Sequence, residues 1–209
     1  MVEAVQGGEG FVIVVAGTPG VGKSTFSHAL AELMGCRVIE PSRIAVERSL
    51  GSPDPEREGT LIIDEEALLR AVKGEIRGRC SIIATHYPGV FLNDDDLYQA
   101  TPLVALLRLN PLLLVSRLEG RGWGRRKVLE NVMAEALGSV AQELKEFEDM
   151  VIEVDTSGVD LNGSLARFFE KVEAWDVGIR VDWLTLDEVV QAVVRWGAEL
   201  DLYEDRPGY

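Results

Sequence analysis

The chain contains, at residues 17–25, the stretch Gly17-Thr18-Pro19-Gly20-Val21-Gly22-Lys23-Ser24-Thr25. It fits the Walker A pattern, in which Gly, any four residues and Gly-Lys-Ser/Thr form a loop that binds nucleotide phosphates. The glycines allow backbone angles that other residues avoid, so that consecutive N–H groups point inward at an anion. We therefore predict that Lys23 reaches the β- and γ-phosphates of a bound nucleotide and that Ser24 binds Mg²⁺.

The residues on either side of this loop supply the strand and the helix that a phosphate-binding loop requires. Residues 11–16 (FVIVVA) are apolar and largely β-branched, as in a strand buried on both faces. Residues 23–34 carry apolar side chains at helical spacing and are followed by Gly35, a typical helix end. The helix N-terminus then adds its dipole to the phosphate site. The alternative is an ordinary glycine-rich turn between a strand and a helix.

Strands and helices alternate along the rest of the chain. Together with residues 11–16, the predicted strands are residues 37–40, 80–85, 102–109 and 150–154. Helices are expected between them, including one over residues 111–121 and one over residues 125–147. This alternation predicts an α/β fold with a parallel sheet covered by helices on both faces, and 209 residues suffice for one such domain.

The composition restricts the classes of function. No apolar run approaches the length of a membrane span and the first ten residues lack the features of a leader, so we expect a soluble, cytoplasmic protein. The net charge is −14, and it is uneven: residues 1–129 hold 16 acidic and 15 basic residues, residues 130–209 hold 19 and 6. Such acidity argues against direct nucleic-acid binding and favours either a basic partner or simple solubility.

Two further features point to phosphate chemistry. The strand over residues 80–85 ends at His86, where ligand groups sit in doubly wound sheets, although a histidine that merely caps the loop is equally compatible. The one strongly basic segment consists of Arg117, Arg121, Arg125, Arg126 and Lys127. Four residues apart on a helix, Arg117 and Arg121 share a face and offer two guanidinium groups to phosphate oxygens. Three glycines at 120, 122 and 124 would let this segment close as a lid, whereas the alternative is a solvated helix face.

The basic segment also carries a resemblance. Residues 117–123 (RLEGRGW), followed by Lys127, Glu130-Asn131 and Glu135, resemble the lid signature of the adenylate kinase isoenzyme 6 family, also called the coilin-interacting nuclear ATPase family. With the Walker A loop and His86, the resemblance covers about residues 11–158. It implies a P-loop nucleoside monophosphate kinase fold, with five strands in the order 2-3-1-4-5, a short helical lid over residues 117–130 and a C-terminal helical extension over residues 175–209.

The resemblance also implies roles for residues. Mg-ATP would be held by the Walker A residues and contacted by Arg121 from the lid, with Arg117 as a second phosphate ligand. The monophosphate AMP would bind in the segment over residues 38–60. Adenine would be bordered by Asp155, Thr156, Ser157 and Gly158.

Two departures from the family pattern concern turnover and the acceptor. Ala84 stands where family members carry a Walker B-like acid two residues before the histidine, and such an acid orients Mg²⁺ through water. Arg43 and Val46 replace an acid and an arginine that are often present, so the identity of the accepting monophosphate is open; Arg48 is a candidate to compensate.

Three functions are therefore considered. The first is transfer of the γ-phosphoryl group of Mg-ATP to AMP, with Lys23, Arg117, Arg121 and His86 as the catalytic set. The second is an ATPase that acts in assembly of the small ribosomal subunit and binds a basic ribosomal protein. The third, a GTPase switch, is weakest, because no Asn-Lys-x-Asp sequence occurs.

The two cysteines test the predicted strand order. In the order 2-3-1-4-5, Cys36 and Cys80 lie at the starting ends of neighbouring parallel strands. We expect their Cα atoms to be close, whereas a bond between the two stays open at this point.

Overall fold

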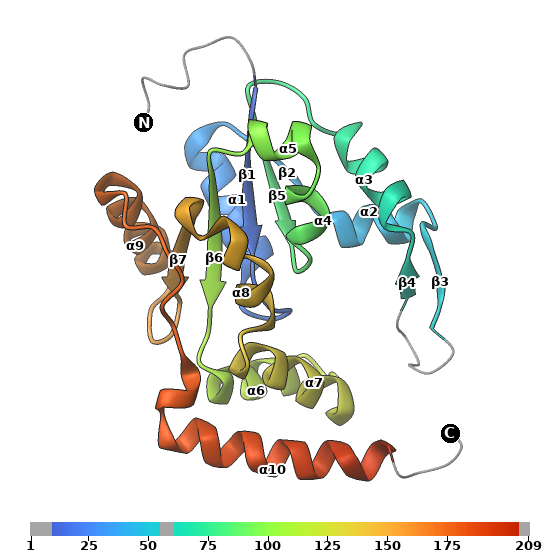
Figure 1. The fold of residues 1–209 in the computed structure, drawn as a ribbon, viewed down its shortest axis with the longest axis vertical. Helices are drawn as coiled ribbons and strands as arrows, with labels where there is room; N and C mark the ends of the chain where they lie inside the picture. Colours follow the sequence, from blue (N-terminus) through green and yellow to red (C-terminus); the bar gives the residue numbers. More distant parts are fainter. Residues whose placement is uncertain (1–9, 55–60, 205–209) are drawn as a thin grey trace.

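The computed structural model describes residues 10–54 and 61–204. A five-stranded parallel sheet forms its centre (Figure 1). Its strands are β1 (Phe11–Ala16), β2 (Arg37–Ile39), β5 (Cys80–Thr85), β6 (Leu103–Arg108) and β7 (Val151–Asp155). They lie in the order β2-β5-β1-β6-β7, which is the predicted order 2-3-1-4-5 once the two short strands β3 and β4 are set aside. The predicted α/β fold is therefore confirmed.

Helices cover both faces of this sheet because its central strands are apolar on both sides. Alternate residues of β1 point to opposite cores, Ile13 and Val15 to one and Val12 and Val14 to the other. The first core is closed by α1 (Lys23–Met34) and α9 (Leu161–Ala174). The helices at the second core are α2 (Pro41–Glu47), α3 (Glu65–Lys73), α4 (Gly89–Leu92), α5 (Asp95–Ala100) and α8 (Ser139–Glu143).

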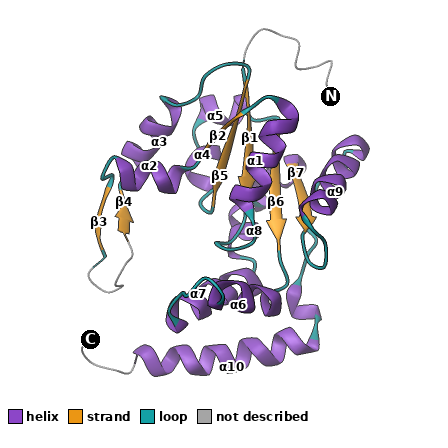
Figure 2. Cartoon of the chain, turned by 180° about the vertical axis from the view of Figure 1, so that it is seen from behind, coloured by secondary structure: helices purple, strands orange, loops and turns teal. Residues whose placement is uncertain are grey.

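Three helices stack beyond the carboxyl ends of the strands. They are α6 (Pro111–Glu119), α7 (Arg125–Ala136) and α10 (Asp187–Glu204), with α10 lying along the outer side of the other two (Figures 1 and 2). Short 3-10 turns, η2 (Lys145–Met150) and η3 (Trp183–Thr185), precede β7 and α10 respectively. The antiparallel hairpin of β3 (Gly51–Pro53) and β4 (Leu61–Ile63) lies beyond α2 and α3 and projects away from the sheet.

Two helix boundaries differ from the sequence prediction. The helix predicted over residues 111–121 ends at Glu119, so Arg121 lies in the following turn and does not share a helix face with Arg117. The helix predicted over residues 125–147 is interrupted after α7, because Gly138 adopts a left-handed φ of 68°. A glycine permits this conformation without steric cost, and the chain turns there into α8.

The cysteines confirm the strand register. Cys36 and Cys80 are joined by a disulfide, and their Cα atoms are 4.7 Å apart. Arg37 of β2 pairs with Ser81 of β5, so both cysteines lie at the amino ends of these strands. The Walker A loop lies at the opposite, carboxyl ends of the strands. Of the helices described, none is long and apolar enough to cross a bilayer.

Candidate functional site: a phosphate-binding loop at the carboxyl edge of the sheet

The Walker A residues form a loop between β1 and α1. Gly17, Gly20 and Gly22 adopt φ values of 146°, 97° and 114°, which side chains with a Cβ rarely tolerate. No side chain caps the N-terminus of α1, whose first N–H groups are therefore open to an anion. The backbone has the form that phosphate binding requires.

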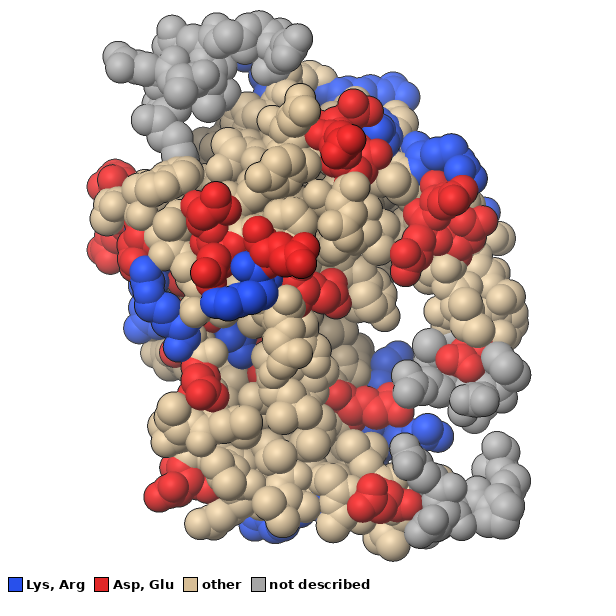
Figure 3. Space-filling model, in the orientation of Figure 1, with Lys and Arg blue, Asp and Glu red and all other residues tan. Residues whose placement is uncertain are grey.

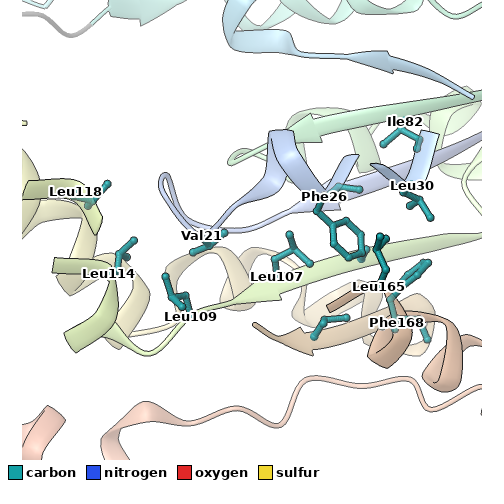
Figure 4. Packing of buried hydrophobic residues seen from close by; sticks show 14 of the residues in the cluster. Val21, Phe26, Leu30, Ile82, Leu107, Leu109, Leu114, Leu118, Leu165 and Phe168 are labelled. Atoms are coloured by element: carbon teal, nitrogen blue, oxygen red, sulfur yellow. The ribbon is translucent and has the colours of Figure 1, made fainter. Parts of the chain in front are cut away.

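Helix α6 covers the back of this loop at close range. A Cβ on Gly20 would lie 2.6 Å from Leu118 Cδ2 and 2.8 Å from Leu114 Cδ1. Figure 4 shows Val21 turned into the same cluster, near Leu114 and Leu109. The loop is thus packed against α6, so that a shift of α6 would be felt directly by the loop.

Lys23 is the first residue of α1, and its side chain turns back over the loop. Its Nζ donates a hydrogen bond to the carbonyl oxygen of Thr18 at 3.1 Å. Burial lowers the pKa of Lys23 from 10.5 to about 8; the carboxylate of Glu135 opposes this shift, and the positive charge of Arg121 adds to it. Lys23 is therefore mostly protonated at pH 7 but close to titration.

The two arginines predicted to bind phosphate both act on the loop or on Lys23. Arg117 Nη1 donates to the carbonyl oxygens of Gly20 and Val21 at 3.3 and 3.2 Å. Arg121 is exposed, and its charge is close enough to Lys23 to lower the pKa of the lysine. Three cationic groups therefore gather around the N-terminus of α1.

The other basic residues of this segment are engaged elsewhere. Arg125 pairs with Glu119 at 2.6 Å and with Glu199 of α10 at 2.8 Å. Arg126 pairs with Glu130 at 3.2 Å, and Lys127 Nζ lies 4.7 Å from the centre of the Trp123 ring. The pair with Glu199 ties the start of α7 to α10. Arg117 and Arg121 are the basic residues of this segment that act on the loop or on Lys23.

His86 lies directly after β5, at the same edge of the sheet as the loop. Burial, and then the charge of Lys23, lower the pKa of His86 from 6.5 to about 4. Its imidazole is therefore neutral at pH 7, and it stacks at a tilt on Tyr87 with 4.0 Å between ring centroids. His86 is therefore close enough to Lys23 for the charge of the lysine to act on it.

The residues that could hold Mg²⁺ are few. The side chain of Ser24 is exposed in the first turn of α1, as a magnesium ligand must be. Ala84 is buried in β5 beside Val15 and offers no side-chain oxygen, and within residues 10–54 and 61–204 no group of three or more His, Cys, Asp or Glu residues is placed to hold a metal ion. Mg²⁺ usually takes one or two protein oxygens together with phosphate oxygens and water, so Ser24 fits this role without an acid at position 84.

The loop predicted to border adenine follows β7. Thr156 Oγ1 donates to the carbonyl oxygen of Arg108 at 2.9 Å, and Ser157 Oγ accepts from the N–H of Asn110 at 2.8 Å. Gly158 completes the turn with a φ of 70°. These bonds fix the loop to the end of β6 and the start of α6.

The segment predicted to bind the monophosphate contains α2 and one strand of the hairpin, and its residues 55–60 lie outside the described residues. A hollow of about 420 Å³ is lined by residues from both strands and from the start of α3, including Ser49, Leu50 and Asp64. Arg48, the candidate to compensate for the missing arginine, pairs with Glu75. Arg43 pairs with Glu47 at 2.8 Å.

Behind the loop lies a buried charged cluster that the sequence analysis did not predict as part of the site. Arg108, at the end of β6, pairs with Glu135 of α7 and with Glu153 of β7, each at 2.9 Å. β6 carries a single charge, Arg108, in an otherwise apolar run (LVALLR), and β7 (VIEVD) carries one buried charge, Glu153, before Asp155 at its end. Opposite charges within neighbouring buried strands are a signal that could have indicated this pair.

Known proteins share this architecture and much of the sequence. Residues 13–138 match the family described as an AAA domain. A protein of Saccharolobus islandicus named “Putative adenylate kinase” is 37% identical over 161 residues, which cover 77% of this chain and 82% of the relative. A protein of the same name from Thermococcus kodakarensis is 39% identical over 147 residues, covering 70% and 77%.

Among solved structures, a gluconokinase from Sinorhizobium meliloti 1021 has a TM-score of 0.51 at 17% identity, over 79% of this chain and 93% of that chain. That similarity concerns the fold alone. The sequence relatives carry the argument further, since their identity exceeds 30% over most of their length. The chain therefore belongs to the AAA-domain family, and it is related to the archaeal proteins named “Putative adenylate kinase”.

Proposed function

We propose that the protein is a nucleoside monophosphate kinase that transfers the γ-phosphoryl group of Mg-ATP to AMP and releases two ADP. The observation that carries this proposal is the convergence of Lys23, Arg117 and Arg121 on the uncapped N-terminus of α1. Phosphoryl transfer depends mostly on positioning and on neutralising charge, which these groups supply. The name of the relatives supports the same reaction.

The protonation state of His86 favours AMP over water as the acceptor. In transfer to AMP, a phosphate oxygen of AMP forms the new bond to the γ-phosphorus while the bond to the β–γ bridging oxygen breaks. That attacking oxygen carries no proton at neutral pH, so no general base is required. Hydrolysis would need a base for the attacking water, and an imidazole whose pKa is about 4 is a weak one. In this proposal His86 is a neutral hydrogen-bonding group near the phosphates.

The proposal is tested by measuring ADP production from Mg-ATP with and without AMP. A kinase produces ADP rapidly only when AMP is present, and Lys23→Ala abolishes that stimulation. A strict ATPase produces ADP at the same rate in both conditions, and this result would contradict the proposal.

A second candidate function is ATP hydrolysis coupled to binding of a basic ribosomal protein of the small subunit. One observation favours it: acidic residues gather over η2 and α8 on the face seen in Figure 3. Of these acids, Glu148 is already paired with Lys145, and Glu143 has a pKa raised by desolvation and accepts a hydrogen bond from the backbone of Gly89. Glu146 and Asp149 are exposed and remain the best candidates for contact with a basic partner.

This second function is tested with a basic peptide from such a ribosomal protein. Its affinity should fall as salt is raised, and should fall further in Glu146→Gln/Asp149→Asn. A matched control, Asp187→Asn/Glu188→Gln at the start of α10, changes the net charge equally and should retain binding. Affinity that is absent, or that ignores both salt and these substitutions, would exclude the docking role.

A further inference from the structure

We infer that Glu135 is a positioning residue for the phosphate-binding loop, and that it couples the loop to the C-terminal segment over residues 178–185. The inference rests on the proposed function only in that the loop binds ATP. Its elements are hydrogen bonds between buried groups from four separate parts of the chain: the Walker A loop, the end of β6, the end of α7 and the C-terminal segment.

The carboxylate of Glu135 is the centre of these bonds, and it is 2% exposed. Its Oε2 accepts a hydrogen bond from Thr18 Oγ1 at 2.6 Å. Its Oε1 accepts from Arg108 Nε at 2.9 Å, from Trp183 Nε1 at 3.0 Å and from the N–H of Leu109 at 3.2 Å. Oε1 thus accepts three of these four bonds and Oε2 the fourth, so the position of the carboxylate is determined from several directions.

Thr18 transmits that position to the chemistry. Its side chain donates to Glu135, and its carbonyl oxygen accepts from Lys23 Nζ. Thr18 is therefore fixed between the carboxylate and the lysine that would contact phosphate.

The C-terminal segment is attached to the same cluster through Arg108 and Glu153. Arg108 Nη1 donates to Glu153 Oε1 at 2.9 Å and to the carbonyl oxygen of Val181 at 3.1 Å. Glu153 Oε2 in turn accepts from the N–H groups of Arg180 and Val181 at 2.6 and 2.8 Å. The segment thus lies beside β7 and is held by buried charges.

The charge balance makes the coupling electrostatic as well as geometric. Within the cluster, one guanidinium group faces two carboxylates, which leaves a surplus negative charge in a buried place. The ammonium group of Lys23 is the cation that Glu135 influences from the other side. Buried charges are costly unless paired, so loss of any member would alter the position of Thr18 and, through it, of Lys23.

A hollow of about 360 Å³ lies beside Arg108, between α8 and residues 179–184. On this side the segment is not packed tightly, so its hydrogen bonds to the cluster contribute a larger share of its attachment. By linkage, if the segment holds the loop in its binding form, nucleotide binding must stabilise the segment to the same degree.

The first test compares two tryptophans through the same substitution. Trp183→Phe removes the hydrogen bond to Glu135 and keeps an aromatic ring, and it should weaken the affinity for ADP about threefold. Trp196→Phe, in a buried residue of α10, is the matched control and should change the affinity less than about twofold. Equal effects of the two substitutions would overturn the inference.

A second pair of variants acts at the loop. Thr18→Val keeps the shape and removes the hydroxyl group, so the affinity for ADP should fall about tenfold. Thr18→Ser keeps the hydroxyl group and should stay within about twofold of the wild type. If Ser fails to restore what Val loses, the hydrogen bond to Glu135 is not the positioning contact.

Hydrogen exchange gives a readout that a purely structural role would not move. Saturating ADP should slow exchange of the Arg180 and Val181 amides at least threefold in the wild type and leave it unchanged in Thr18→Val. Exchange that ignores ADP in the wild type would contradict the coupling. The two affinity comparisons and the exchange experiment depend on ADP binding and not on catalysis. A protein that binds ADP normally but fails to phosphorylate AMP would therefore contradict the proposed reaction and leave this inference intact.

Discussion

The pKa of Lys23 predicts an alkaline limit on nucleotide binding that an ordinary lysine would not produce. With a pKa of about 8, about nine-tenths of the Lys23 side chains carry a proton at pH 7 and about one-tenth at pH 9. Because the positive charge attracts the phosphates, affinity is present below pH 8 and is lost as pH rises through it. The dissociation constant of Mg-ATP should therefore increase about tenfold between pH 7 and pH 9.

The assay is isothermal titration of Mg-ATP from pH 7 to pH 9.5, where the phosphates of ATP no longer titrate. Lys23→Arg, which stays charged, should show no such limit. The direction of two further shifts follows from the charges around the lysine. Arg121→Ala removes a group that lowers the pKa of Lys23 and should move the limit to higher pH, and Glu135→Gln should move it to lower pH. Affinity that is constant to pH 9.5 in the wild type would refute the reasoning.

Three further predictions concern the lid, the histidine and the disulfide. Lys23→Ala should weaken ATP binding itself, whereas Arg121→Ala should mainly lower kcat. The loss should be at least tenfold, because an arginine finger contributes about 10³- to 10⁵-fold in other phosphoryl-transfer enzymes. An unchanged kcat/KM in Arg121→Ala excludes the lid role. Because the pKa of His86 is about 4, kcat/KM should be free of a histidine limb near pH 6.5, which a pH profile with His86→Gln as control would reveal. Reducing the bond between Cys36 and Cys80, which closes a loop of sequence separation 44, should lower the free energy of unfolding by about 4 kcal/mol in urea; reduced and oxidised forms that unfold at the same urea concentration would contradict this.

The sequence predicted the parts of the fold that depend on local pattern. The strand over residues 11–16, the glycine loop and the helix from Lys23 follow from apolar periodicity and glycine placement, and the structure has them at those positions. The cysteines were expected to be close because the order of parallel strands places both at the same edge, and they are bonded.

What the sequence could not predict depends on contacts between distant segments. The helix predicted through Arg121 ends at Glu119, because residues 120–124 form a turn in which Gly122 adopts a left-handed φ of 74°. The cluster of Arg108, Glu135 and Glu153 joins residues up to 45 positions apart, so periodicity within any one segment does not reveal it. The resemblance did include Glu135, but a signature gives no information about which groups a side chain contacts.

The fate of the γ-phosphoryl group tests the central claim most directly. The enzyme is incubated with Mg-ATP labelled with ³²P at the γ-phosphorus, together with AMP, and the products are separated over time. Transfer to AMP predicts that the label appears in ADP from the first turnovers, at a rate that Lys23→Ala and Arg121→Ala reduce. Label that appears only in inorganic phosphate, at a rate indifferent to AMP, would contradict the assignment of AMP as the acceptor.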